Sequence, residues 1–167
     1  MFSLTRLLDR FGALLAHFGL ERKIADRDQP ALTYLLRYYL IGRRAWHLLP
    51  VLVLHRFLMS DVGHLHDHPW SFVSWVLAGG YWEDRPQPDG SIRRKWRGRW
   101  SIAWRRATDL HRVTLPEHAT GPTYTLVFML PRTRVWGFAE VDREGIRTWW
   151  RWDTYLTERQ RAKQAEG

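Results

Sequence analysis

The sequence predicts an all-β fold, an antiparallel sandwich or barrel with one helix at each end. Most of the chain after Pro30 consists of short segments rich in Val, Ile, Leu, Tyr, Phe and Trp, as strands are. Turn-forming residues separate these segments, as in the run PQPDG at residues 86–90. The 167 residues contain no internal repeat and no low-complexity linker. We therefore expect a single domain with its own core.

Residues 3–20 are expected to form the N-terminal helix. Ser3 can cap its start and Gly19 its end. The apolar side chains recur at helical spacing and form one stripe, at Leu4, Leu7, Leu8, Phe11, Leu14, Leu15 and Phe18. A helix packed on the domain is the favoured interpretation, and a helix lying on a membrane surface is the alternative. Residues 1–30 are assigned to this helix and a connector.

The strands are expected within residues 31–156, which we assign to the barrel. The strand-like segments cover residues 32–42, 51–60, 72–84, 92–104, 110–115, 123–130, 134–141 and 148–152. Residues 157–167 are polar, which is typical of a short, frayed C-terminal helix.

Composition limits the possible chemistry. The chain has no cysteine, which excludes disulfides, thiolate metal ligands and a cysteine nucleophile. No apolar run reaches the roughly 20 residues that span a bilayer, and no secretory signal is recognisable, so a cytoplasmic location is expected. The formal net charge is +9. The most basic stretch, Arg93–Arg99 between two tryptophans, predicts either a solvated outer strand face, which we favour, or a nucleic-acid surface.

The motif HLHDHPW at residues 64–70 is the strongest chemical signal. Residues two apart on a strand face the same way, so His66 and His68 can meet one metal ion, and neutral imidazole suits Fe, Zn, Ni and Cu. A third ligand must come from elsewhere, and His111 in a later apolar strand is the best candidate. His55 lies in another strand and is interpreted as a core residue or one behind the ligands.

This order of motifs resembles the cupin superfamily. In that family a His-x-His pair precedes a strand and a glycine turn, and a lone histidine follows on a later strand. Here His66 and His68 match the pair, Gly79 or Gly80 matches the glycine, and His111 matches the lone histidine. The resemblance covers roughly residues 37–138 and implies a small jelly-roll barrel with a divalent metal in its mouth.

One departure from the cupin pattern indicates which type of cupin metal site to expect. The usual glutamate would fall near Phe72 or Val73, where the chain has no acid. A three-histidine site without a carboxylate, together with the text HDHP and LHRV, is similar to the thiol dioxygenases, which use Fe(II) and dioxygen. The layout is also similar to uncharacterised phage and bacterial cupins. Fe(II) is therefore the metal expected first, with Zn, Ni and Mn left open.

Three arginines are candidates to hold an anionic substrate. A neutral three-histidine set leaves the charge of the ion uncompensated, which favours a thiolate or carboxylate at the metal. Arg112, Arg132 and Arg134 could pair with a second anionic group of the substrate. The aromatic candidates for the cavity wall are Tyr81, Tyr124 and Trp136. His64 and Glu83 are alternative ligands or residues that contact the ligands from behind. Glu83 also fits an exposed position in a hairpin.

These observations predict a metal-binding cupin, with a non-haem Fe(II) dioxygenase of small anionic thiols or carboxylates as the leading function. A metal- or ligand-binding module without catalysis is one alternative, and a non-redox isomerase or epimerase is another. Nucleic acid is a possible but less favoured partner, and pairing of two copies into a homodimer is possible.

Overall fold

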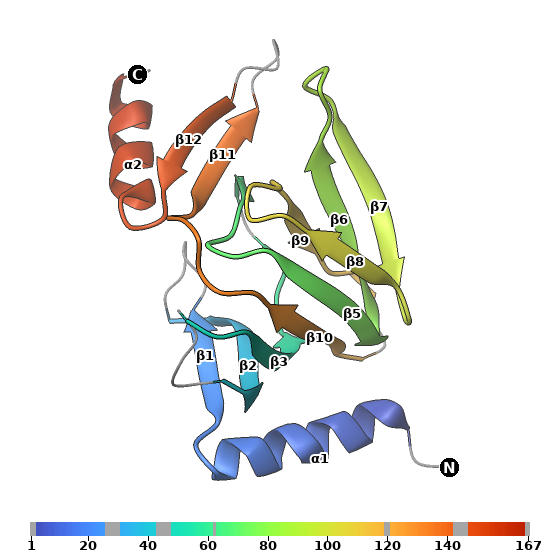
Figure 1. Ribbon diagram of the computed structural model, residues 1–167. Helices are drawn as coiled ribbons and strands as arrows, with labels where there is room; N and C mark the ends of the chain where they lie inside the picture. The colour runs from blue at the N-terminus through green and yellow to red at the C-terminus, as the bar shows by residue number, and fades with distance from the viewer. Residues whose placement is uncertain are drawn as a thin grey trace.

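The structure is a computed structural model that describes residues 3–25, 31–42, 48–61, 63–118, 121–141 and 147–165. Two helices flank the strands at the ends of the chain (Figure 1). The elements in chain order are α1 Leu4–His17, β1 Glu21–Ala25, β2 Thr33–Ile41, β3 Val51–Phe57, β4 Leu65–His66, β5 Phe72–Ala78, β6 Gly80–Pro86, β7 Ile92–Gly98, β8 Ile102–Arg105, β9 Arg112–Thr114, β10 Thr123–Met129, β11 Gly137–Val141, β12 Arg147–Arg151 and α2 Tyr155–Ala165. The predicted all-β fold with two terminal helices is confirmed.

The first layer is a six-stranded antiparallel sheet in the order β1-β2-β3-β10-β5-β8. Alternate side chains of its strands face the interior of the barrel, where two apolar clusters form around Val53 and Val76. The opposite face of the same sheet carries Tyr38, Leu54 and Tyr124, which pack against α1.

The second layer consists of two three-stranded sheets, β12-β11-β4 and β7-β6-β9. An isolated antiparallel bridge joins His66 on β4 to His111, the residue before β9. The amide of His66 donates to the carbonyl of His111 at 2.8 Å, and the amide of His111 donates back at 3.0 Å. The two sheets therefore meet edge to edge at these histidines, and together with the six-stranded sheet they form the two layers of a jelly roll.

Helix α1 packs on the outside of the six-stranded sheet. Leu8 and Leu15 bury one stripe of the helix, and Gly12 brings the backbone so close to Tyr38 that an added Cβ would lie 2.9 Å from its ring. Tyr124 donates a hydrogen bond to Asp9 on α1 at 2.6 Å. The helix thus packs on the domain as favoured. Among the described residues, no helix is long and apolar enough to cross a membrane.

The strand boundaries differ from the sequence predictions in several places. The expected strand 72–84 is two strands, because the chain turns at Gly79 with φ of +69°. The expected strand 92–104 is also two, because a turn follows Gly98 and Trp100 has φ of 71°. The assumed connector contains β1, which pairs with β2, and α2 begins at Tyr155, two residues before the predicted tail.

Candidate metal centre

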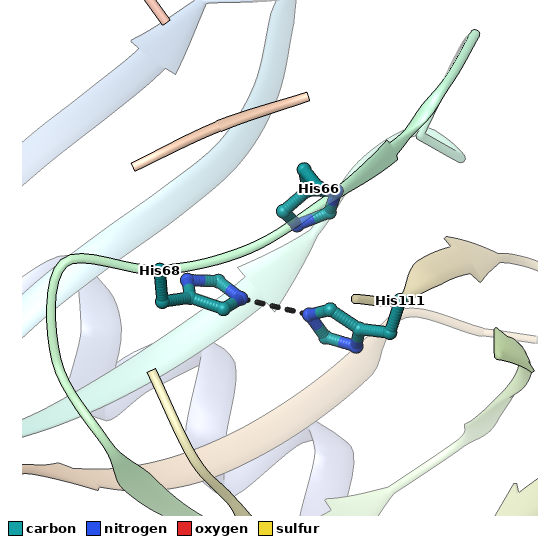
Figure 2. A group of neighbouring side chains, drawn as sticks. All are labelled: His66, His68 and His111. Carbon is teal, nitrogen blue, oxygen red and sulfur yellow. Dashed lines mark hydrogen bonds between the residues drawn. The ribbon is translucent and has the colours of Figure 1, made fainter. Parts of the chain in front are cut away.

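Three histidines converge where the two small sheets meet. The potential ligand atoms of His66, His68 and His111 all lie within 4.8 Å of one another. Nε2 of His68 faces Nε2 of His111 at 2.8 Å, and the three rings point toward one another in Figure 2. Two nitrogens bound to one ion at about 2.1 Å are at most about 4.2 Å apart, so small side-chain rotations bring all three onto one ion. The described chain offers no other cluster of this kind.

Side chains alternate along residues 65–68, so the two histidines face one side of the chain and the residues that hold the motif in place face the other. Leu65 and Asp67 are buried on the side opposite to His66 and His68. The Asp67 carboxylate accepts hydrogen bonds from the amide of Gly137 at 2.7 Å and from Trp149 Nε1 at 3.1 Å, and it pairs with Arg134. Asp67 therefore links the histidine motif to β11 and β12 by hydrogen bonds. These bonds restrict the positions that the rings of His66 and His68 can take.

Glu83 stands directly behind His111. Nδ1 of His111 lies 3.3 Å from Oε1 of Glu83, whose carboxylate also accepts from Arg97 Nε and Arg105 Nε, each at 2.8 Å. Burial by itself raises the pKa of Glu83, but the hydrogen bonds from His111 and Arg105 outweigh it and hold the pKa well below its usual range. Because the carboxylate stays ionised, His111 donates through Nδ1 and turns the lone pair of Nε2 toward the cluster.

A second carboxylate lies behind His66. Oδ2 of Asp61 is 3.7 Å from Nδ1 of His66 and accepts a hydrogen bond from the amide of Val113 at 2.7 Å. Asp61 and Glu83 are thus the carboxylates that accompany the cluster, each beside a ring nitrogen. Carboxylates in such positions orient ligating imidazoles and raise their basicity.

His68 is held neutral before any ion binds. Burial, and then the neighbouring rings of His111 and His66, hold the pKa of His68 well below its ordinary value of 6.5. A neutral imidazole presents one nitrogen with a lone pair, which is the form that binds a metal. Because Nε2 of His111 carries the lone pair, the proton between His68 and His111 belongs to Nε2 of His68. His68 would therefore bind an ion through Nε2 only after this proton leaves and Nδ1 becomes the protonated nitrogen.

A cavity of about 420 Å³ lies in front of the three histidines, lined by residues of both layers. Its wall is largely apolar, with Phe57, Phe72, Val113, Val127 and Met129 among the lining residues. This is the size and character of a small-molecule site.

A polar row crosses this apolar wall. Arg37, His55 and Thr125 stand opposite one another on β2, β3 and β10, and all three line the cavity. Arg37 Nε donates to His55 Nε2 at 3.0 Å, and the guanidinium lies 5.9 Å from the ring of Trp70. Burial and the Arg37 charge hold the pKa of His55 well below 6.5. The buried hydroxyl of Thr125 has no hydrogen-bond partner among the described residues.

The structure divides the predicted substrate residues into two groups. Arg132, Tyr81 and Trp136 line the cavity. The other three do not line it. Arg112 pairs with Asp84 at 2.8 Å, Arg134 pairs with Asp67, and Tyr124 lies under α1 on the outer face of its sheet. Their polar groups are committed to structural contacts, so the placement of Arg112, Arg134 and Tyr124 at the cavity was wrong.

Neither alternative ligand belongs to the group of converging ligand atoms, although Glu83 lies directly behind His111. His64 lines the cavity, but its Nδ1 is 2.5 Å from the hydroxyl of Tyr155 and its Nε2 is 3.4 Å from Glu140. Glu83 was interpreted as exposed hairpin text as well, and this was wrong, because its residue is only 1% exposed. It lies on β6, the central strand of its sheet between β7 and β9, and its carboxylate contacts Arg97, Arg105 and His111.

Sequence reasoning missed Arg37 as a cavity residue. In the sequence, Arg37 looks like an ordinary polar position within an apolar strand. Only its pairing opposite His55 shows which way its side chain faces. A signal was present in the alternation of TYLLRYYLI, where Leu35, Arg37 and Tyr39 share one face. That face includes buried residues, so an arginine on it requires a partner or a ligand.

Comparisons with known proteins support the fold. No family model and no curated protein matches the chain. Among solved structures, a cupin-2 domain protein from Rhodospirillum rubrum matches with a TM-score of 0.51 at 12% identity, over 68% of this chain and 71% of that chain. FeII HppE in complex with its substrate matches with a TM-score of 0.52 at 12% identity, over 66% of this chain and 55% of that one, so the chain spans about half of that protein. The chain has the cupin fold.

Proposed function

We propose that this protein is a non-haem Fe(II) dioxygenase of the three-histidine cupin type, acting on a small anionic thiol or carboxylate. The observation that carries the proposal is the convergence of His66, His68 and His111 on a largely apolar cavity that also contains Arg37. A protein of the same fold, FeII HppE, carries Fe(II), which makes iron the first metal to test.

The donor set fits a divalent transition metal. Three neutral imidazoles suit Fe, Zn, Ni and Cu, and the Glu83 carboxylate fixes His111 in the ligating tautomer. When bound, the ion would supply the redox and Lewis-acid chemistry that joins dioxygen to the substrate. His66, His68 and His111 would occupy one side of the ion, and the cavity side would be left to small molecules.

Charge favours an anionic substrate. Imidazole ligands carry no negative charge, and the charge of Glu83 is matched by Arg97 and Arg105, so Asp61 beside His66 is the carboxylate left to offset part of the charge of a 2+ ion. Arg37 adds a further positive charge to the cavity wall. Its guanidinium has five N–H donors, of which the bond to His55 uses one and a side-chain hydrogen bond to Tyr39 another. The role proposed for Arg37 is to hold a carboxylate of the substrate while the rest of the molecule reaches the ion.

Metal content is the first test. Elemental analysis of untagged protein is compared with the His66→Ala and His111→Ala variants, and with His118→Ala, which changes an exposed histidine. Near-stoichiometric iron that the first two variants lose and His118→Ala retains supports the site. Stoichiometric zinc or nickel keeps the metal site and contradicts the dioxygenase. No metal after reconstitution with Fe(II) contradicts both.

Oxygen consumption tests the reaction. The Fe(II)-loaded protein is screened against small thiols and carboxylates in an oxygen electrode, with His111→Ala as the inactive control. For any substrate found, Arg37→Gln is expected to raise KM by about tenfold or more, since a charge-assisted hydrogen bond is lost. Oxygen uptake that is the same in wild type and His111→Ala contradicts the proposed reaction.

A further inference from the structure

A second hollow, of about 270 Å³, lies on the hairpin formed by β6 and β7 and shares no residue with the histidine cavity. Four of its lining residues are bases and one is an acid. The lining residues are Glu83, Arg85, Pro86, Gln87, Arg93, Lys95 and Arg97. The long hairpin projects beside the other strands in Figure 1. We call this the hairpin hollow.

The hairpin register places two like charges against each other in the hollow. Arg85 on β6 stands directly opposite Arg93 on β7, and Lys95 and Arg97 follow on the same face of β7, with Lys95 opposite Glu83. Like charges directly opposite one another destabilise a strand pair. Within the described chain, neither Arg93 nor Lys95 forms an ion pair, and the buried Nε of Arg85 has no hydrogen-bond partner. An anion in the hollow would relieve this repulsion.

The acids near the hollow already pair with other groups of the chain. Glu83 accepts hydrogen bonds from Arg97 and Arg105, so its charge is matched by two guanidinium groups. Asp109 lies 3.4 Å from Nη2 of Arg85 and also accepts from the amide of Arg106. The hollow therefore keeps an excess of positive charge that the described residues do not offset.

We propose that the hairpin hollow binds a short phosphate chain, such as a di- or triphosphate. Bases at alternate positions of one strand stand about 6.8 Å apart, so one compact polyanion can contact several of them. The volume falls below the roughly 300–1,000 Å³ of drug-sized sites, which favours a small ligand. Arginine and lysine are the side chains that bind phosphate oxygens.

The same geometry disfavours single-stranded nucleic acid. That class of ligand requires aromatic side chains beside the basic groove, on which its bases stack. Side chains alternate between two faces along β7, so Trp96 lies on the face opposite to Lys95 and Arg97, where it pairs with Trp82 at 5.1 Å between ring centroids. Arg94 shares the face of Trp96, but its guanidinium is paired with Asp84 at 2.6 Å. The bases of the hollow therefore lie on the face that does not carry Trp96.

Calorimetric titration tests the proposal on the full chain in buffer without divalent ions, so the result does not depend on the metal site. The ligands are tripolyphosphate and ATP, applied to wild type, to Arg93→Gln/Lys95→Gln, and to Arg6→Gln/Arg106→Gln as a matched control. Both variants remove two positive charges at exposed positions. We expect one site per chain, and an affinity at least about tenfold lower in the first variant alone. Equal affinity for both ligands would show that the site recognises the phosphate chain, and tighter binding of ATP would extend the ligand to a nucleoside triphosphate.

Three results would overturn the proposal. Absence of binding to wild type is one. Equal weakening in both double variants is another, since it would assign the effect to net charge. The third is an oligonucleotide that binds more tightly than tripolyphosphate and loses affinity in Arg93→Gln/Lys95→Gln, because the surface would then be a nucleic-acid site. Thermal unfolding of both variants controls for folding.

Discussion

Oε1 of Glu83 lies 3.3 Å from Nδ1 of His111, while Nε2 of the same ring faces His68 at 2.8 Å. The carboxylate therefore determines which nitrogen of His111 carries a proton and which is available as a ligand. Two arginines hold the carboxylate in turn, so a buried network of charges supports one ligand of the candidate metal site.

The first prediction concerns Glu83→Gln. An amide in place of the carboxylate no longer fixes the tautomer of His111, so metal affinity should fall by about 10–100-fold. The substitution also leaves the buried guanidinium of Arg105 without its counterion, which should lower the free energy of unfolding by about 3–5 kcal/mol. Chelator competition measures the first effect and urea unfolding the second.

Glu117→Gln is the control for this prediction, because Glu117 is exposed and its removal should change neither quantity by more than about 0.5 kcal/mol. A folded Glu83→Gln protein with the metal affinity of wild type would contradict the role assigned to the carboxylate.

The second prediction is a pH dependence that arises from His55. Its pKa is lowered in the folded protein, so above pH about 6.5 the ring is neutral in both the folded and the unfolded state, and its contribution to stability is fully present. As the pH falls through this value, the unfolded chain takes up a proton that the folded chain refuses. The free energy of unfolding should then fall by up to about 1.4 kcal/mol per pH unit for this group.

Urea unfolding at pH 8 and pH 5 measures this loss in wild type and in His55→Gln, which keeps an acceptor for Arg37 and cannot titrate. The loss should be smaller in the variant. His68, whose pKa is also lowered, is present in both proteins, and the largest cause of its shift, burial, is common to both. An identical loss in the two proteins would show that His55 does not titrate as its surroundings require.

Local sequence determined the strands well and the long-range pairs poorly. Alternation placed His66 and His68 on one side of the chain, and the apolar pattern around His111 made it the best candidate for the third ligand, in agreement with the resemblance to cupins. Arg134 could not be assigned in this way, because its partner Asp67 lies on a different strand connection, and only the fold brings the two together. The exposure of Glu83 was misjudged because the residues that follow it, DRPQPDG, are polar, although its carboxylate is buried against Arg105 and His111.

The third prediction distinguishes the structural role of Arg134 from the substrate-binding role proposed for Arg37. Asp67→Ala removes the acceptor of Gly137 and Trp149 and leaves Arg134 unpaired, so the free energy of unfolding should fall by about 3 kcal/mol or more. Arg134→Gln should cost about 1–3 kcal/mol, because the Arg134 side chain is 31% exposed but its removal leaves the buried Asp67 carboxylate with the hydrogen bonds of Gly137 and Trp149. Urea unfolding checks both values.

Arg134→Gln should also leave the metal content and the KM of any substrate unchanged, in contrast to Arg37→Gln. A rise in KM that is larger for Arg134→Gln than for Arg37→Gln would restore Arg134 as the substrate-binding residue and remove Arg37 from that role.

The fourth prediction compares two buried threonines on the same face of β10. Thr123 Oγ1 donates to the carbonyl of Gly80 at 2.9 Å and accepts from its amide at 3.2 Å, whereas the Oγ1 of Thr125 has no partner among the described residues. Valine has nearly the same shape as threonine. Thr125→Val should therefore raise the free energy of unfolding by about 1 kcal/mol, because an unsatisfied buried hydroxyl is removed, while Thr123→Val should lower it by about 1–3 kcal/mol.

Urea unfolding of the two variants against wild type measures the difference, and the shared strand and burial make each the control of the other. Because Thr125 also lines the cavity, its hydroxyl is placed to bond a ligand there. Stabilisation of the free protein combined with weaker substrate binding would assign the hydroxyl to the ligand. A loss of stability in Thr125→Val equal to that in Thr123→Val would mean that the Thr125 hydroxyl has a hydrogen-bond partner within the folded chain. The hydroxyl would then not be assigned to ligand binding.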